Sequence, residues 1–412
     1  MRKILSYIII LCIVTACAPY EEGQKLYDVP VSLVTDYAIS DDDVITVTLT
    51  SNTSCVYKQD IKGTETAHFM LPAGIYQVAA SGSHDEEYNR IVWNGNMADL
   101  IVGDKNDSNV MGQGHSVKVQ RTIIDLANPL LIKEIYAGGC QKDDGSGKFL
   151  MDKCIILYNN SAYPKSLDGV CIGMIDPYNA EATSHLFLNN GVLDYESEDW
   201  VPAINGYWYF KDGEAIQPYS ELVVAVNGAI DHTLTYKNSV NYANSAYYAM
   251  YDPETIGLDG TKYNNASNYP APSYLIPDTH HLKAVKYGSG TAWPLSATSP
   301  AIILFQVKDT TPLEYINDNI IYPPSKEGNK ANACARIPRE WVLDAVEVFK
   351  AQDSKCKKRL TPDLDNGSVA LTGGYGHSLL RKSHVNDAGK TIYEDTDNST
   401  NDFIEIDNCT LR

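Results

Sequence analysis

Basic side chains are scarce in this 412-residue sequence. Lysine and arginine number 33 against 52 aspartates and glutamates, and the formal net charge is −19. Nucleic acids and anionic lipid surfaces both favour clustered positive charge, so neither is expected to be a partner. The length is sufficient for two or three domains, each with a hydrophobic core of its own.

The sequence also lacks the motifs that mark common active sites and metal centres. It contains no G-x-S-x-G, no H-E-x-x-H and no C-x-x-C. We therefore predict a protein that is not an enzyme and that has no cofactor and no metal site.

Phenylalanine is rare as well, at 7 residues against 28 tyrosines. Tyrosine combines an apolar ring with a polar tip, which suits half-buried strands and wet binding surfaces.

Beyond the N-terminus no apolar run is long enough for a transmembrane helix. At the N-terminus, Arg2 and Lys3 precede a continuous apolar run over residues 4–14. This run has the length of a signal-peptide core. It ends in Val14-Thr15-Ala16-Cys17, which resembles a bacterial lipobox. The resemblance implies a lipoprotein signal peptide over residues 1–16 and lipidation of Cys17. The alternative is an ordinary secretory signal with an incidental cysteine.

Residues 17–27 form a polar, acidic stretch that we interpret as a tether. Glu21 and Glu22 follow the cysteine closely, and this resembles the export signal of Bacteroides-type lipoproteins. The resemblance implies a lipid-anchored protein of the outer membrane that is exposed on the cell surface. The alternative is retention in the periplasm.

Residues 28–124 are predicted to form one all-β domain. Residues 44–50 alternate between apolar side chains and threonine with a period of two, as a half-buried strand does. In residues 69–78, Pro72-Ala73-Gly74 separates two strand-like runs and predicts a chain reversal. The pattern F-x-L-P-x-G-x-Y-x-V resembles transthyretin-like and carboxypeptidase-regulatory-like sandwich modules. This implies an immunoglobulin/transthyretin-like sandwich that acts as a spacer or docking platform.

A second, larger β-domain is predicted over residues 130–412. Two apolar runs, residues 130–136 and 154–158, flank a polar loop and predict a hairpin of two buried strands. Residues 154–159 and 166–170 resemble the strand pair of the lamin-tail domain.

Two positions depart from the lamin-tail pattern, because Ile156 replaces its usual acidic residue and Val170 its usual tryptophan. The resemblance implies an immunoglobulin-fold sandwich without activity of its own. The chain as a whole resembles an uncharacterised family of Bacteroides-type surface lipoproteins.

Residues 176–281 are rich in Tyr, Asn, Gly and Pro, and we interpret them as a long loop insertion with a turn of helix at residues 245–250. Binding residues often lie on loops carried by a rigid scaffold. Tyr207, Trp208 and Tyr209 are the candidate ligand-binding residues, since exposed aromatic rings stack on sugars or cover apolar ligands. The alternative is that these rings only cover the sandwich, because exposed aromatic clusters are rare.

Smaller signals concern the cysteines and the oxygen-rich loops. Cys140 and Cys154 flank the hairpin loop and are the predicted disulfide, because an exported protein permits one.

Residues 363–367 and 395–399 alternate oxygen-bearing side chains as a Ca²⁺ loop does. Both lack the glutamate that closes an EF-hand loop, so turns rich in Asp and Asn are the preferred interpretation. Rings at His280 and His281 would point to opposite faces of a strand.

Two classes of function follow. The first is a non-catalytic outer-membrane surface lipoprotein that binds a ligand or assists a TonB-dependent transporter in uptake. The second is an accessory module of an exported hydrolase or nuclease, or a purely structural or adhesive envelope protein. The absence of catalytic motifs favours the first.

Overall fold

The computed structural model describes residues 25–52, 55–85, 89–103, 115–125, 130–181, 188–189, 192–258, 260–263, 268–322, 332–372, 376–386 and 388–412. The predicted signal peptide, Cys17 and most of the tether lie outside these residues. The chain divides into two compact units, unit 1 (Met1–Leu126) and unit 2 (Ala127–Arg412). Among the described helices, none combines the length and the apolar character that crossing a membrane requires.

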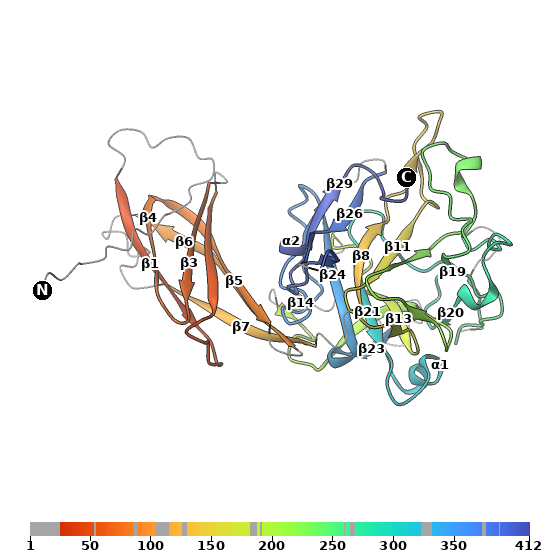
Figure 1. Ribbon diagram of the computed structural model, residues 1–412, viewed down its shortest axis with the longest axis horizontal. Helices are drawn as coiled ribbons and strands as arrows, with labels where there is room; N and C mark the ends of the chain where they lie inside the picture. Colours follow the sequence, from red (N-terminus) through yellow and green to blue (C-terminus); the bar gives the residue numbers. More distant parts are fainter. Residues whose placement is uncertain are drawn as a thin grey trace, which may run out of the picture. The chain divides into compact units, whose positions relative to one another are not determined.

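Unit 1 is a seven-stranded sheet (Figure 1). Its strands run in the order β3-β2-β5-β6-β7-β1-β4, and all neighbours are antiparallel except β1 and β7. The strands are β1 (Leu26–Val34), β2 (Val44–Ser51), β3 (Val56–Lys62), β4 (Ala67–Pro72), β5 (Gly74–Asp85), β6 (Asn89–Val102) and β7 (His115–Asp125).

The alternation in β2 sets which face of the sheet is buried. Ile45, Val47 and Leu49 are fully buried in the core of unit 1, while the intervening threonines are partly exposed. Pro72 ends β4, Gly74 begins β5, and Ala73 lies between the two strands. These strands pair with other partners: β4 with β1, and β5 with β2 and β6. The bend therefore passes the chain from one part of the sheet to another, and β4 and β5 do not form a hairpin with each other.

Unit 2 is larger and nearly all β. Its strands are β8 (Leu130–Tyr136), β9 (Cys140–Gln141), β10 (Lys148–Phe149), β11 (Cys154–Asn159), β12 (Lys165–Ser166), β13 (Val170–Ile175), β14 (Leu188–Asn189), β15 (Val192–Leu193), β16 (Trp200–Tyr209), β17 (Ala215–Ile216), β18 (Glu221–Ala225), β19 (Tyr248–Met250), β20 (His281–Lys286), β21 (Ala301–Gln306), β22 (Ile320–Ile321), β23 (Cys334–Pro338), β24 (Val342–Lys350), β25 (Val369–Leu371), β26 (Ser378–Arg381), β27 (Ser383–Val385), β28 (Thr391–Tyr393) and β29 (Phe403–Ile406). Its short helices are α1 (Pro312–Tyr315), α2 (Ser399–Asp402) and the 3₁₀ turns η1 (His232–Leu234), η2 (Asp278–His280), η3 (Ile316–Asp318) and η6 (Arg339–Trp341).

Fourteen of these strands form one continuous sheet. The order is β25-β24-β21-β13-β16-β20-β19-β18-β11-β8-β26-β29, and β23 joins β16 and β22 at the side. The main hydrophobic core combines Ile132, Leu157 and Val224 from one half with Ile172 and Leu304 from the other. The sheet therefore folds onto itself as a sandwich, which confirms the predicted all-β class.

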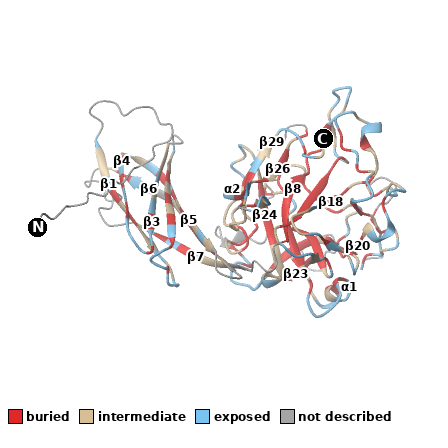
Figure 2. Cartoon of the chain, viewed as in Figure 1, coloured by how far each residue is buried: buried red, intermediate tan, exposed pale blue. Residues whose placement is uncertain are grey.

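Both faces of the central strands are covered. Every residue of β8, β11 and β13 is buried, so burial does not alternate along these strands (Figure 2). Their side chains are mostly apolar, and the exceptions are the buried Lys133, Glu134 and Asn159. A second cluster outside β11 and β18 contains Tyr242, Ile276 and Cys409, which come from loops and the C-terminal segment. The predicted hairpin is confirmed, because β8 and β11 pair antiparallel.

The structure corrects the predicted insertion over residues 176–281. Residues 200–209 form β16, which lies within the sheet between β13 and β20. Residues 248–250 form β19, where a turn of helix was predicted. Asn205 and Gly206 adopt φ of 64° and 157°, and they mark a break inside β16: its first half pairs with β23 and its second with β20.

Candidate binding pocket

The three aromatic residues predicted to bind a ligand are not a surface platform. Tyr207 and Trp208 are 0% and 1% exposed. The Tyr207 hydroxyl donates to the Pro312 carbonyl at 2.5 Å, and Trp208 stacks on Tyr263 with ring centroids 5.5 Å apart. Tyr209 is partly buried. Because these residues occupy a strand covered on both faces, the interpretation as a binding site is wrong for Tyr207 and Trp208, and their rings serve the core.

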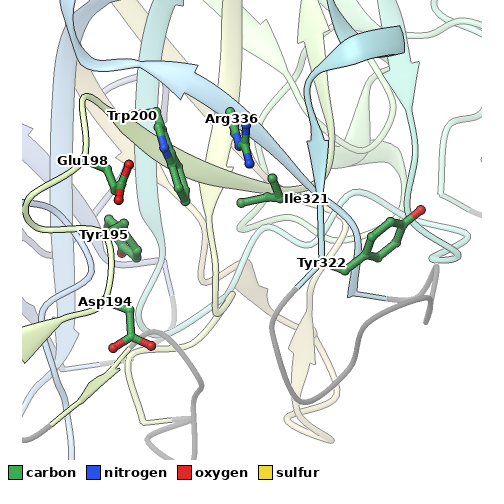
Figure 3. A pocket seen from close by; sticks show the side chains of 7 residues that line it. All are labelled: Asp194, Tyr195, Glu198, Trp200, Ile321, Tyr322 and Arg336. Carbon is green, nitrogen blue, oxygen red and sulfur yellow. The ribbon is translucent and has the colours of Figure 1, made fainter.

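A pocket of about 210 Å³ lies at the other end of β16 (Figure 3). It combines two carboxylates, one guanidinium, three aromatic rings and one aliphatic side chain. Its lining residues are Asp194, Tyr195, Glu198, Trp200, Ile321, Tyr322 and Arg336.

Strand register brings one side of the pocket together. Trp200 pairs with Pro338, and Arg336 pairs with Pro202, so Trp200 and Arg336 share one face of the β16–β23 pair. Ile321 of β22 pairs with Cys334, two residues before Arg336, and so lies on the same face. Side chains from three neighbouring strands thus line this part of the pocket.

The Trp200 indole is held between two neighbours. Its ring centroid lies 6.0 Å from that of Tyr195, with an angle of 29° between the planes. The Arg336 guanidinium carbon lies 5.5 Å from the indole centroid, within the range of a cation–π contact. In Figure 3, Tyr195 and Arg336 lie on opposite sides of the indole. Trp200 is therefore a fixed part of the wall.

Hydrogen bonds from neighbouring residues hold the loop that carries Asp194 and Glu198. Arg339 donates from Nη2 to the Tyr195 carbonyl at 2.9 Å and to the Glu196 carbonyl at 2.6 Å. The same side chain forms an ion pair with Asp363 at 3.1 Å. The buried Tyr195 hydroxyl donates to the Arg359 carbonyl. These bonds hold the loop in place, so the two exposed carboxylates are presented by a rigid backbone.

The pocket carries charges of both signs. Within the part of the chain that the structure describes, Asp194, Glu198 and Arg336 form no ion pair within 4 Å. Arg336 is exposed, as are both carboxylates. Charged groups that have no partner in the protein are available to a ligand. The described residues contain no group of three His, Cys, Asp or Glu side chains placed to hold a metal ion. The arrangement is suited to binding.

The predicted disulfide between Cys140 and Cys154 is wrong. Both thiols are free and buried. Cys140 lies opposite Phe149 in the β9–β10 pair, and Cys154 lies opposite Tyr136 in the β8–β11 pair. The two cysteines therefore belong to different strand pairs. The sulfur atom near Cys154 is that of Cys409, at 3.9 Å, which is a hydrogen-bond distance.

The first oxygen-rich loop is a turn that holds a lysine. Lys358 donates its ammonium to the carbonyls of Asp365, at 2.6 Å, and Gly367. The Asp365 carboxylate accepts from the backbone N–H of Gly367 at 2.9 Å and of Ser399 at 2.8 Å. The oxygen atoms that a Ca²⁺ ion would need are thus taken by protein donors. In the second loop, Asp402 accepts from the N–H of Thr396 and Asn398.

The two tandem histidines contact different groups. His280 stacks on Tyr248 with centroids 4.0 Å apart, and its Nε2 lies 3.7 Å from Glu214. His281 meets Tyr251 edge-on.

Sequence reasoning missed this pocket because its residues come from three segments far apart in the chain. The one local signal is Asp194-Tyr195-Glu196-Ser197-Glu198-Asp199-Trp200, where four acidic residues accompany two aromatic ones. The lipidation residue Cys17 lies outside the described residues.

Two comparisons relate this chain to known proteins. Residues 217–409 match the model of a family described as a protein of unknown function, DUF4876. The fold is similar to the crystal structure of a DUF4876 family protein from Bacteroides thetaiotaomicron VPI-5482, with a TM-score of 0.53 and 24% sequence identity. That likeness covers 92% of this chain and 94% of the other. No curated protein matches.

Proposed function

We propose that the chain is a DUF4876 family member that acts as a non-catalytic surface lipoprotein, anchored in the outer membrane through Cys17 and binding a ligand in unit 2. The observation that carries the binding role is the pocket beside Trp200, where Arg336, Asp194 and Glu198 have no ion-pair partner among the described residues. Charged side chains that have no ion-pair partner and lie on a rigid wall favour a ligand-binding role over a purely structural one.

The anchor is supported by the N-terminal segment. A basic start, an apolar run over residues 4–14 and a small-residue approach to Cys17 are the features that a lipoprotein signal requires. One acyl chain alone binds a membrane weakly, whereas the diacylglycerol of a lipoprotein supplies two. A surface protein so placed is positioned to deliver its ligand to a TonB-dependent transporter, which we propose as its partner.

The second candidate is an accessory module of an exported hydrolase or nuclease, and a structural or adhesive role is the third.

Fractionation of cells that produce the tagged full chain tests the anchor. We expect the parent protein in the outer-membrane fraction with incorporated palmitate, and the Cys17→Ala variant without palmitate and released from membranes. Cys12→Ala is a matched control within the same segment and should behave as the parent. The proposal would be contradicted if the parent protein stayed in the membrane without palmitate, or if Cys17→Ala behaved as the parent does. Affinity purification of the tagged chain from these membranes identifies its partner. A β-barrel transporter that co-purifies supports the uptake role, and a hydrolase that co-purifies supports the second candidate.

A further inference from the structure

We infer that the pocket beside Trp200 binds a zwitterion, namely a free α-amino acid with an apolar side chain. This inference rests on the proposed binding role of unit 2 and names the ligand class of the same site. An α-amino acid carries a carboxylate, an ammonium and a side chain on one carbon atom. The pocket offers a complementary group for each.

The ligand carboxylate fits Arg336. A guanidinium presents a planar fork of N–H donors, and its bonds to carboxylates are short and charge-assisted. The Arg336 guanidinium is exposed on the pocket wall and lies against the Trp200 ring. This contact restrains the side chain, so less conformational entropy is lost when a carboxylate binds.

The ligand ammonium fits the two carboxylates. Asp194 and Glu198 both line the pocket from the loop that Arg339 holds in place. Figure 3 places these two carboxylates on the side of the pocket away from Ile321 and Tyr322. An ammonium has three donors and no acceptor, so it can donate to more than one of the carboxylates that line the pocket.

The side chain of the ligand fits the remaining wall. Ile321 and Tyr322 supply apolar surface and are each partly buried. A volume of about 210 Å³ is below the ~300–1,000 Å³ typical of sites for drug-sized ligands. The pocket is therefore of a size for a single small molecule.

Other ligand classes fit less well. A sugar that stacks on an aromatic ring needs an open ring face, and both neighbours of the Trp200 indole already lie against it. A simple anion would leave Asp194 and Glu198 without a partner, and a simple cation would leave Arg336 without one. A ligand of one sign only would be repelled by the like charges on the pocket wall, so a ligand with both signs is favoured.

Isothermal titration of the purified full chain tests the inference, with L-phenylalanine and L-leucine as probes. N-acetyl-L-phenylalanine amide has the same side chain without either charge, and D-glucose represents saccharides. We expect saturable binding of at least one amino acid and none of the uncharged derivative. Arg336→Gln should weaken amino-acid binding at least tenfold, because a charge-assisted bond is lost. Asp194→Asn combined with Glu198→Gln should do the same.

Matched variants separate the pocket from general effects. Arg121→Gln removes a guanidinium–ring contact of the same kind elsewhere, which Arg121 makes with Tyr37 in unit 1 at 4.4 Å. Asp199→Asn changes a carboxylate next to Trp200 that does not line the pocket. Both should bind as the parent does. Circular dichroism and thermal unfolding must show each variant folded. Where Arg336→Gln fails this check, Arg336→Lys replaces it, with the same expected direction.

Three results would overturn the inference. They are no saturable binding of either amino acid, equal binding of the uncharged derivative, or unchanged binding in Arg336→Gln. Saturable glucose binding that Arg336→Gln abolishes would replace the ligand class and leave the binding role standing. The membrane fractionation above decides the anchor independently of these results.

Discussion

A buried lysine offers the most quantitative test of the fold. Lys153 directly precedes β11 and is 8% exposed. Its ammonium donates to the Leu295 carbonyl at 3.1 Å. Burial lowers the pKa of Lys153 from 10.5 to about 8. The folded state therefore releases this proton more readily than the unfolded state.

The magnitude follows from the two pKa values. At 1.36 kcal/mol per pKa unit, a fall from 10.5 to about 8 corresponds to a destabilisation of about 3 kcal/mol. Between pH 8 and 10.5 the unfolded state holds more protons, so this group makes the free energy of unfolding rise with pH. The destabilisation is complete below about pH 8 and absent above about pH 10.5.

Lys153→Met removes the amine and keeps an unbranched apolar stem. It also removes the bond to the Leu295 carbonyl, at a cost of about 1 kcal/mol. At pH 7 the variant should exceed the parent in free energy of unfolding by about 2 kcal/mol. At pH 10.5 the order should reverse, with the variant less stable by about 1 kcal/mol.

Urea unfolding followed by tryptophan fluorescence measures the difference. Four of the five tryptophans, Trp200, Trp208, Trp293 and Trp341, lie in unit 2, so the signal reports mainly on that unit. Lys355→Met at an exposed position is the control and should show no pH-dependent difference. A stability difference that is the same at pH 7 and 10.5, or a Lys153→Met variant less stable than the parent at pH 7, would refute the reasoning.

Three further predictions concern other buried groups. The buried Glu347 carboxylate pairs with Arg359, whose Nη2 lies 2.6 Å from Oε1. Glu347→Ala should therefore lower the free energy of unfolding by about 3–5 kcal/mol in urea titrations. A loss below about 1 kcal/mol would contradict this prediction. Burial lowers the pKa of His281 below its ordinary 6.5, so the folded state disfavours its proton and stability should fall as the pH drops through 6.5, and less steeply in His281→Gln. Burial raises the pKa of the Cys140 thiol to about 12, and the Cys154 thiol is buried from solvent, so both should react with iodoacetamide only after denaturation. A 140–154 linked peptide in a non-reducing digest would disprove the free-thiol assignment.

Local sequence patterns predicted those strands whose apolar and polar residues follow a pattern within a few consecutive positions. The alternation at residues 44–50 identified β2, and two apolar runs identified the β8–β11 hairpin. The break at Asn205 and Gly206 misled the prediction, because turn-forming residues also mark irregularities inside a strand. A strand that changes partners at that break looks like a loop in the sequence.

The pocket could not be predicted because it depends on pairing between distant segments. Trp200 and Arg336 meet only because β16 pairs with β23, and Ile321 joins them only because β22 pairs with β23. The cysteine prediction was wrong for the same reason: proximity along the chain placed Cys140 beside Cys154, whereas strand pairing separates them.

A crystal structure of the full chain grown with L-phenylalanine tests the central claim most directly. We predict the ligand beside Trp200, with its carboxylate at hydrogen-bond distance from Arg336 and its ammonium at Asp194 or Glu198. An empty pocket at a saturating concentration, or a ligand with its ammonium toward Arg336, would contradict the account.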